Sequence, residues 1–129
     1  MRTNAGADFQ AAQMGSTSPG GNGANYIALT ANATAPAASD TTLTAEIATA
    51  SGGLIRAQAT YAHTAGTNTY TLTKTFTANA SDVLPVTPAK IGVFTASSSG
   101  TMVFESLITS PPTLAAVGDQ ITITETVTM

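Results

Sequence analysis

The stretch TNTYTLTKTFTA, Thr67–Ala78, decides the fold class of this chain. Threonine fills every second position of it, and the larger side chains between the threonines are Tyr70, Leu72, Lys74 and Phe76. Side chains of a β-strand alternate between two faces, whereas those of an α-helix repeat about every 3.6 residues. The alternation therefore predicts a β-strand with one threonine face and one largely apolar face.

The same register returns near the C-terminus in QITITETVTM, Gln120–Met129, whose second row is Ile121, Ile123, Glu125, Val127 and Met129. Further strands are predicted at 25–31, 53–62, 89–96 and 101–108, with Ile55, Ala57, Ala59 and Tyr61 as the core row of 53–62. About six or seven short strands separated by turns predict an all-β fold over residues 25–129. The expected architecture is an antiparallel β-sandwich or Greek-key domain of Ig-like or jelly-roll-like type.

Two charges interrupt the apolar rows of these strands, Lys74 in the first and Glu125 in the last. An isolated charge that faces a core is costly, so each needs a partner if both rows face inward. One solution is a structural ion pair between Lys74 and Glu125, or polar partners at a sheet edge. The alternative is that both rows lie near the rim of the sandwich, where the two side chains reach water.

Residues 1–24 are rich in glycine and carry few large apolar side chains, which predicts an extended N-terminal arm outside the β-domain. Within the arm, residues 8–14 could form one helical turn with Asp8 as its cap. Asp8, Phe9 and Met14 are the residues expected to hold the arm against a partner. The composition fits both a disordered arm and an arm that becomes ordered on a partner.

The chain of 129 residues is poor in charge, with 9% charged residues, and rich in threonine and alanine, with 25 and 24 copies. Seven acidic against four basic residues and a pI near 4.6 argue against nucleic acid as a partner, because that requires a basic surface. No stretch has the length of a membrane span, so no membrane partner is expected. A weakly charged surface instead suits contact with other subunits.

The side chains that usually carry catalysis are scarce. The chain has one histidine, His63, and no cysteine, and no serine lies in a G-x-S-x-G context. The carboxylates lack the spacing of a calcium loop, and Asp40, Asp82 and Asp119 fall in loops, where they are predicted to accept turn hydrogen bonds. We therefore expect no enzymatic activity, no metal and no cofactor.

Four segments carry a resemblance to a known family. They are ANYIALTANATAPAASDTTLTAEI at 24–47, GGLIRAQATYAHTAGTNTYTLTKTFTA at 52–78, PAKIGVFTASSSGTMVFESL at 88–107 and LAAVGDQITITETVTM at 114–129. Together they resemble the small β-rich structural proteins, head decoration or tail proteins, of tailed bacteriophages. The resemblance implies a virion protein that is assembled in the host cytoplasm and exposed on the particle surface.

Of the two positions in the particle, the glycine-rich arm favours a capsid decoration (cement) protein that bridges and stabilises major capsid subunits. Its partners are then the major capsid protein and further copies of itself, in a closed homo-oligomer such as a trimer. The alternative is a tail, baseplate or fibre-type adhesin module that binds another tail protein or a host glycan through loops such as SSSG at 97–100 or HTAGTN at 63–68. Three Tyr, four Phe and no Trp are a small supply of aromatic side chains for stacking on sugars.

Overall fold

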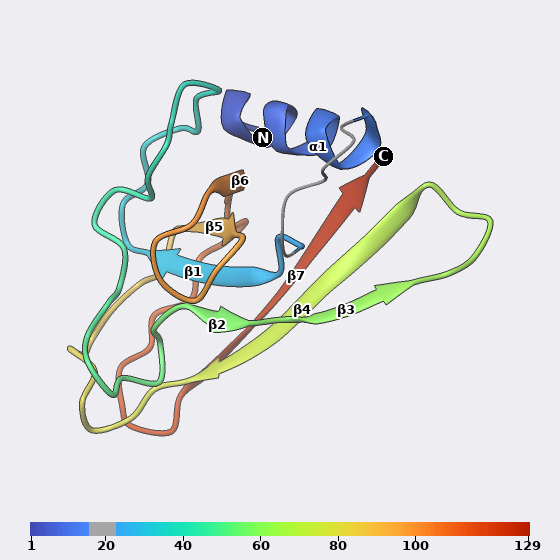
Figure 1. The fold of residues 1–129 in the computed structure, drawn as a ribbon. Helices are drawn as coiled ribbons and strands as arrows, with labels where there is room; N and C mark the ends of the chain where they lie inside the picture. The colour runs from blue at the N-terminus through green and yellow to red at the C-terminus, as the bar shows by residue number, and fades with distance from the viewer. Residues whose placement is uncertain (16–22) are drawn as a thin grey trace.

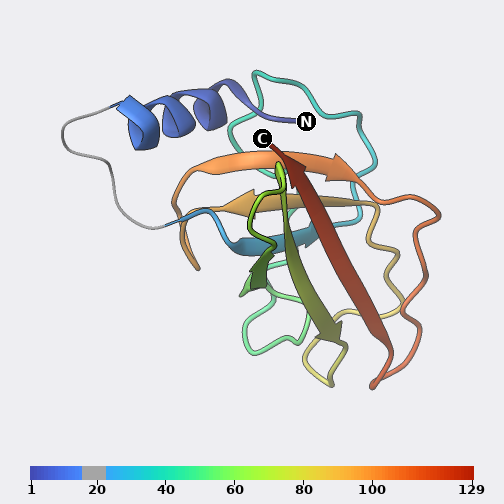
Figure 2. The same cartoon turned by 90° about the vertical axis from the view of Figure 1, so that its right-hand side faces the viewer.

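The computed structural model describes residues 1–15 and 23–129, which form two antiparallel sheets packed face to face (Figure 1). The strands are β1 (Tyr26–Thr30), β2 (Ala57–Gln58), β3 (Thr60–His63), β4 (Thr69–Thr77), β5 (Lys90–Phe94), β6 (Met102–Leu107) and β7 (Gln120–Thr128). The β1 sheet has the order β2-β1-β5-β6 and the β4 sheet has the order β3-β4-β7. Strands of the two sheets cross steeply (Figure 2). The prediction of an all-β antiparallel sandwich is confirmed.

The pairing of β4 with β7 follows the alternation of the sequence. Every threonine of β4 from Thr69 to Thr75 lies opposite a threonine of β7, whereas Phe76 lies opposite Ile121. The apolar rows face the β1 sheet, and the core that they form includes Leu72, Phe76, Ile121 and Ile123 from the β4 sheet and Ile27, Leu29, Ile91 and Val93 from the β1 sheet. Burial of each such large side chain stabilises the fold by about 1.5–3 kcal/mol.

The segment predicted as one strand over 53–62 changes sheets at Ala59. β2 pairs with β1 and β3 pairs with β4, while the Ala59 amide between them donates to the Asn25 carbonyl at 2.8 Å. The predicted core row is wrong at its ends, because Leu54 is buried and Tyr61 is 59% exposed. Residues 53–56 are not in a strand, so Leu54 enters the core from a turn and a period of two does not apply.

The N-terminal residues lie on the β-domain, so the prediction of an extended segment differs from the structure over residues 1–15. Residues 1–3 run along β6, where Arg2 forms a bridge with Phe104. The helix α1 (Asn4–Gly15) then continues beside the same edge of the β1 sheet (Figure 2). No helix within the described residues has the length and apolar character needed to cross a membrane.

The cap of α1 is Thr3, and the predicted cap Asp8 lies inside the helix. The Oγ1 of Thr3 accepts from the Gly6 amide at 2.9 Å and donates to the Met102 carbonyl at 2.8 Å, so one hydroxyl both starts the helix and attaches it to β6. A Cβ atom on Gly6 would overlap the carbonyl oxygen of Val103. The close approach of the helix to the strand therefore requires glycine at this position.

Candidate functional site

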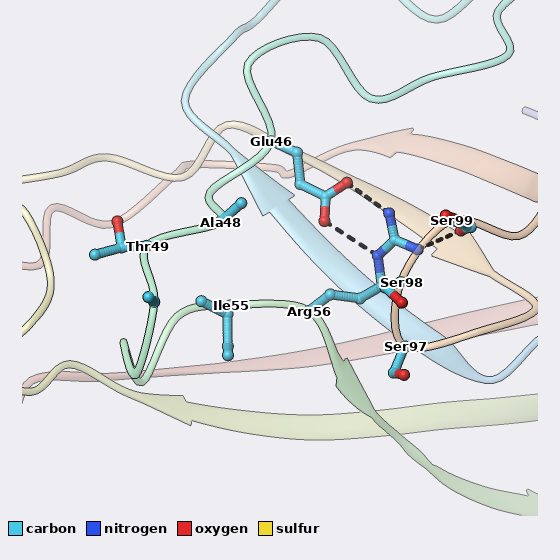
Figure 3. A pocket seen from close by; sticks show the side chains of 9 residues that line it. Glu46, Ala48, Thr49, Ile55, Arg56, Ser97, Ser98 and Ser99 are labelled. Carbon is cyan, nitrogen blue, oxygen red and sulfur yellow. Dashed lines mark hydrogen bonds and ion pairs between the residues drawn. The ribbon is translucent and has the colours of Figure 1, made fainter.

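The Arg56 guanidinium ties two loops together on the outer side of the β1 sheet (Figure 3). Its Nε and Nη2 donate to the Glu46 carboxylate at 3.1 and 2.7 Å, and its Nη1 donates to the carbonyls of Ala96 and Ser99 at 3.1 and 2.7 Å. The Cζ atom lies 3.5 Å from the centre of the Phe94 ring, which is a cation–π contact. A two-point contact between Arg and a carboxylate fixes geometry as well as neutralising charge.

A hollow of about 380 Å³, here called the Arg56 hollow, opens beside this ion pair. Its walls combine the hydroxyl side chains of Thr49 and Ser97–Ser99 with the small apolar side chains of Ala48, Ala50 and Ile55. Because Glu46 neutralises Arg56, the hollow offers hydroxyl groups and no free positive charge. Its chemistry suits a small uncharged polar group and does not suit a phosphate or a carboxylate.

A second ion pair lies beneath the loop that contains Thr34 and Asp40. Lys90 Nζ is 2.7 Å from Glu105 Oε1, and the two side chains are 3% and 1% exposed. Lys90 Nζ also donates to the Thr34 carbonyl at 3.1 Å. The hydrogen bond from the Ala37 amide lowers the pKa of Asp40, and Glu105 and the charge of Lys90 lower it further.

Lys90 and Glu105 were missed by sequence reasoning, although a signal for them exists. Each is the single charge in a strand that is otherwise apolar or small, AKIGVF and MVFESL, as Lys74 and Glu125 are in the apolar rows of their strands. Lys90 and Glu105 lie on the outer side of the β1 sheet rather than in the core between the sheets, and a lone buried charge needs a partner there as well.

Lys74 and Glu125 lie on one face of β4 and β7 as diagonal neighbours, because Lys74 is opposite Ile123 and Glu125 is opposite Leu72. In the described part of the chain the ion pairs involve other residues, and Lys74 and Glu125 are not joined. The Glu125 carboxylate accepts instead from Ser106 Oγ at 3.0 Å. Both side chains are half-buried, and Glu125 has the polar partner that was the alternative to the predicted pair.

The three residues predicted to hold the arm on a partner have different surroundings. Asp8 is exposed on α1, and the side chain of Met14 lies outside the described residues. Phe9 is half-buried and lines a cavity of about 280 Å³ between α1 and the β-domain, together with Tyr70 and Phe104. Phe9 therefore faces the protein's own β-domain in this structure.

The loop carboxylates act as predicted, by accepting backbone hydrogen bonds. Asp82 accepts from the amides of Gly53 and Asn79 at 2.9 and 2.7 Å. Asp119 accepts from the amides of Ala116 and Ala115, and these bonds lower the pKa of Asp119. Across residues 1–15 and 23–129, no three His, Asp or Glu side chains lie close enough together to hold a metal ion.

The outward side of the β4 sheet forms an uncharged surface, here called the threonine face. It consists of Thr69, Thr71, Thr73, Thr75 and Thr77 of β4 with Thr122, Thr124, Thr126 and Thr128 of β7. The hydroxyls of the cross-strand neighbours Thr75 and Thr122 lie 2.9 Å apart. The four threonines of β7 are exposed, so a regular array of methyl and hydroxyl groups faces outward.

No protein-family model matches this chain, and a search of curated protein sequences finds no match.

Proposed function

We propose that this protein is a structural component of a tailed-bacteriophage particle, where it acts as a capsid decoration protein that bridges and stabilises major capsid subunits. The observation that carries the proposal is the threonine face, an ordered sheet surface that carries no charge and whose β7 threonines are all exposed. The resemblance of residues 24–129 to phage structural proteins supports the same role.

An uncharged sheet surface is suited to this work because contact with a neighbour removes few charges from water. Desolvation of charged groups opposes association, whereas threonine contributes methyl groups that gain from burial and hydroxyls that can exchange water for a protein acceptor. Each contact is weak by itself. When capsid symmetry repeats it, the linked contacts bind far more tightly than a single one.

The N-terminal segment supplies the second proposed contact, through Asp8, Phe9 and Met14. Asp8 is exposed on α1 and is free to meet a capsid subunit without any change in the fold. Replacement by alanine is expected to leave the β-domain folded and to weaken binding to particles. Retention of Asp8→Ala protein on particles at the wild-type level would remove Asp8 from the contact.

The test of the function is the number and position of copies on purified particles of the phage that encodes this chain. A decoration role predicts hundreds of copies distributed over the head, measured by quantitative mass spectrometry and by imaging of particles that carry a labelled chain. A few to a few dozen copies located at the tail would favour the alternative, a tail, baseplate or fibre-type module. Absence from purified particles would contradict both.

The adhesin alternative has one observation in its favour, which is that the loop SSSG at 97–100 lines the Arg56 hollow with hydroxyl groups. A sugar ring could accept hydrogen bonds there, but the residues that line the hollow include no aromatic side chain on which it could stack. A glycan array probed with wild-type protein and with Ser98→Trp protein, which obstructs the hollow, tests this role. Glycan binding that Ser98→Trp abolishes would favour the adhesin.

A further inference from the structure

Among residues 1–15 and 23–129, the β4 sheet ends at the outer edge of β7, which has no neighbouring strand. On the β1 sheet, residues 1–3 cover the corresponding edge of β6, with the Glu105 amide donating to the Met1 carbonyl at 3.0 Å and the Thr3 amide donating to the Val103 carbonyl at 3.3 Å. Within the described residues, β7 pairs with β4 and with no strand on its other side. The β4 sheet therefore has three strands against the four of the β1 sheet.

The pairing with β4 defines which peptide groups of β7 face this open edge. The Met129 amide donates to the Asn68 carbonyl at 2.7 Å, on the β4 side. Peptide groups alternate in direction along an antiparallel strand, so those of the β7 threonines point away from β4. The outward set is Thr122, Thr124, Thr126 and Thr128. The edge thus presents a regular row of backbone donors and acceptors to an incoming strand.

Two hollows border the same edge, at the place where a fourth strand of the β4 sheet would lie. One, of about 440 Å³, is lined by Arg2, Phe104 and residues 125–129, and the other, of about 250 Å³, by Ile91, residues 106–109 and residues 122–125. Exposed apolar side chains line the first of them, with Met1 57% and Met129 61% exposed. A strand added to β7 would cover these side chains, and their burial would favour its binding.

Glu125 specifies the charge of the incoming strand. Its half-buried carboxylate lines both hollows, and its hydrogen-bond donor is the Ser106 hydroxyl. The nearby cation Arg2 donates from Nη1 to Gln10 Oε1 at 2.6 Å. A lysine or arginine at the inward position beside Glu125 would neutralise the carboxylate. Antiparallel pairing of two β7 edges would instead bring two Glu125 side chains close together near the middle of the strands, which disfavours a second copy of this chain.

We propose that β7 accepts an extended segment of another polypeptide as a fourth strand of the β4 sheet. The segment alternates apolar with small polar side chains and carries a lysine or arginine beside Glu125. The backbone edge supplies affinity, and the two hollows with Glu125 supply specificity. In the proposed function, this edge of β7 is the surface that holds a partner in the particle. Only the source of the partner, a phage particle, rests on the proposed function.

The peptide TYTLTKTFT, copied from β4, is a suitable probe because this sequence already pairs with the other edge of β7. A register shift of two residues keeps its faces unchanged and places its lysine opposite Glu125. We expect calorimetry to detect binding to the full chain, and hydrogen exchange to show protection at the outward amides of β7. A peptide with glutamate in place of lysine is expected to bind at least about tenfold more weakly to the wild-type protein, and Glu125→Lys to reverse this preference.

Proline at Thr124 removes an outward amide and leaves the hydrogen bonds to β4 in place, so Thr124→Pro is expected to fold and to lose peptide binding. Thr124→Ala keeps the amide and is the matched control, expected to bind as the wild type does. Undiminished binding to folded Thr124→Pro, or no binding to the wild type, would overturn the proposal. A dimer of the free protein that Thr124→Pro disrupts would also overturn it, by making a second copy the occupant. If the peptide does not bind but hundreds of copies of this chain are found on particles, only the β7 contact is rejected. If the chain is absent from particles, the virion role is rejected.

Discussion

Lys90 and Glu105 form an ion pair with 2.7 Å between Nζ and Oε1, and both side chains are almost fully buried. They lie on neighbouring strands, where Lys90 is opposite Leu107 and Glu105 is opposite Gly92, so the pair spans β5 and β6 diagonally. Removing two charges from water is costly, and the attraction between them offsets this cost only while both are present. The pair therefore makes the outer side of the β1 sheet sensitive to the loss of either partner.

Glu105→Gln leaves a buried ammonium group without its counter-charge. We expect the free energy of unfolding to fall by about 3–5 kcal/mol, measured by urea denaturation followed by circular dichroism. The double variant Lys90→Met with Glu105→Leu removes both charges and is expected to regain most of that loss. Equal stability of Glu105→Gln and wild-type protein would show that the pair contributes little to the fold.

Gly6→Ala tests how α1 is held on the β-domain. The added Cβ would overlap the Val103 carbonyl oxygen, so the helix must move away from β6. We expect faster hydrogen exchange and faster proteolysis within residues 1–15, with a smaller change in the unfolding of the β-domain. Asp8→Ala, on the exposed part of the same helix, is the control and is expected to leave both rates unchanged. Unchanged protection of Gly6→Ala would contradict this account of the helix contact.

The sandwich could be predicted from the sequence because β4 and β7 are long and strictly alternating. One face of each strand is buried, so a shift of either strand by a single residue would expose its apolar row, including Phe76 or Ile121. The burial of these rows therefore fixes the register that the alternation of the sequence indicates. The short strands were less predictable. β2 and β3 belong to different sheets because the chain bends at Ala59, and no local pattern in residues 53–62 distinguishes this from one continuous strand.

The N-terminal helix and the ion pairs depend on contacts between residues far apart in the sequence. Thr3 caps α1 through the local bond from the Gly6 amide, but its bond to the Met102 carbonyl, which attaches the helix to β6, is not encoded within residues 1–15. The sequence left open whether Glu125 pairs with Lys74, with another polar group or with water, and its bond to Ser106 joins two strands that are far apart in the sequence. The partner of a charge follows from sheet order, and sheet order is the part of a β-fold that sequence periodicity leaves open.

The lowered pKa values of two loop carboxylates predict how the stability of the fold responds to acid. Backbone amides hold the pKa of Asp119 and of Asp40 below the ordinary value of 3.8. The unfolded chain then binds protons more readily than the folded one, so this contribution to stability is fully present above about pH 3.8 and is lost as the pH falls through the lowered folded pKa values. We expect the free energy of unfolding of the wild type to decline below about pH 4. The free energy of unfolding of Asp119→Asn is expected to decline less steeply over the same range. Parallel profiles for the two proteins would exclude Asp119 as a cause.

Arg56→Lys separates the geometry of the loop contact from its charge. Lysine keeps the positive charge but cannot donate to both Glu46 oxygens and to the carbonyls of Ala96 and Ser99 in one plane. We expect unfolding to become easier by about 1–3 kcal/mol and residues 97–100 to exchange amide hydrogens faster, measured by denaturation and hydrogen exchange. Thr49→Ala changes the wall of the same hollow without touching the guanidinium and is expected to leave stability within about 0.5 kcal/mol of the wild type. If Arg56→Lys is as stable and as well protected as the wild type, the charge alone holds the two loops together.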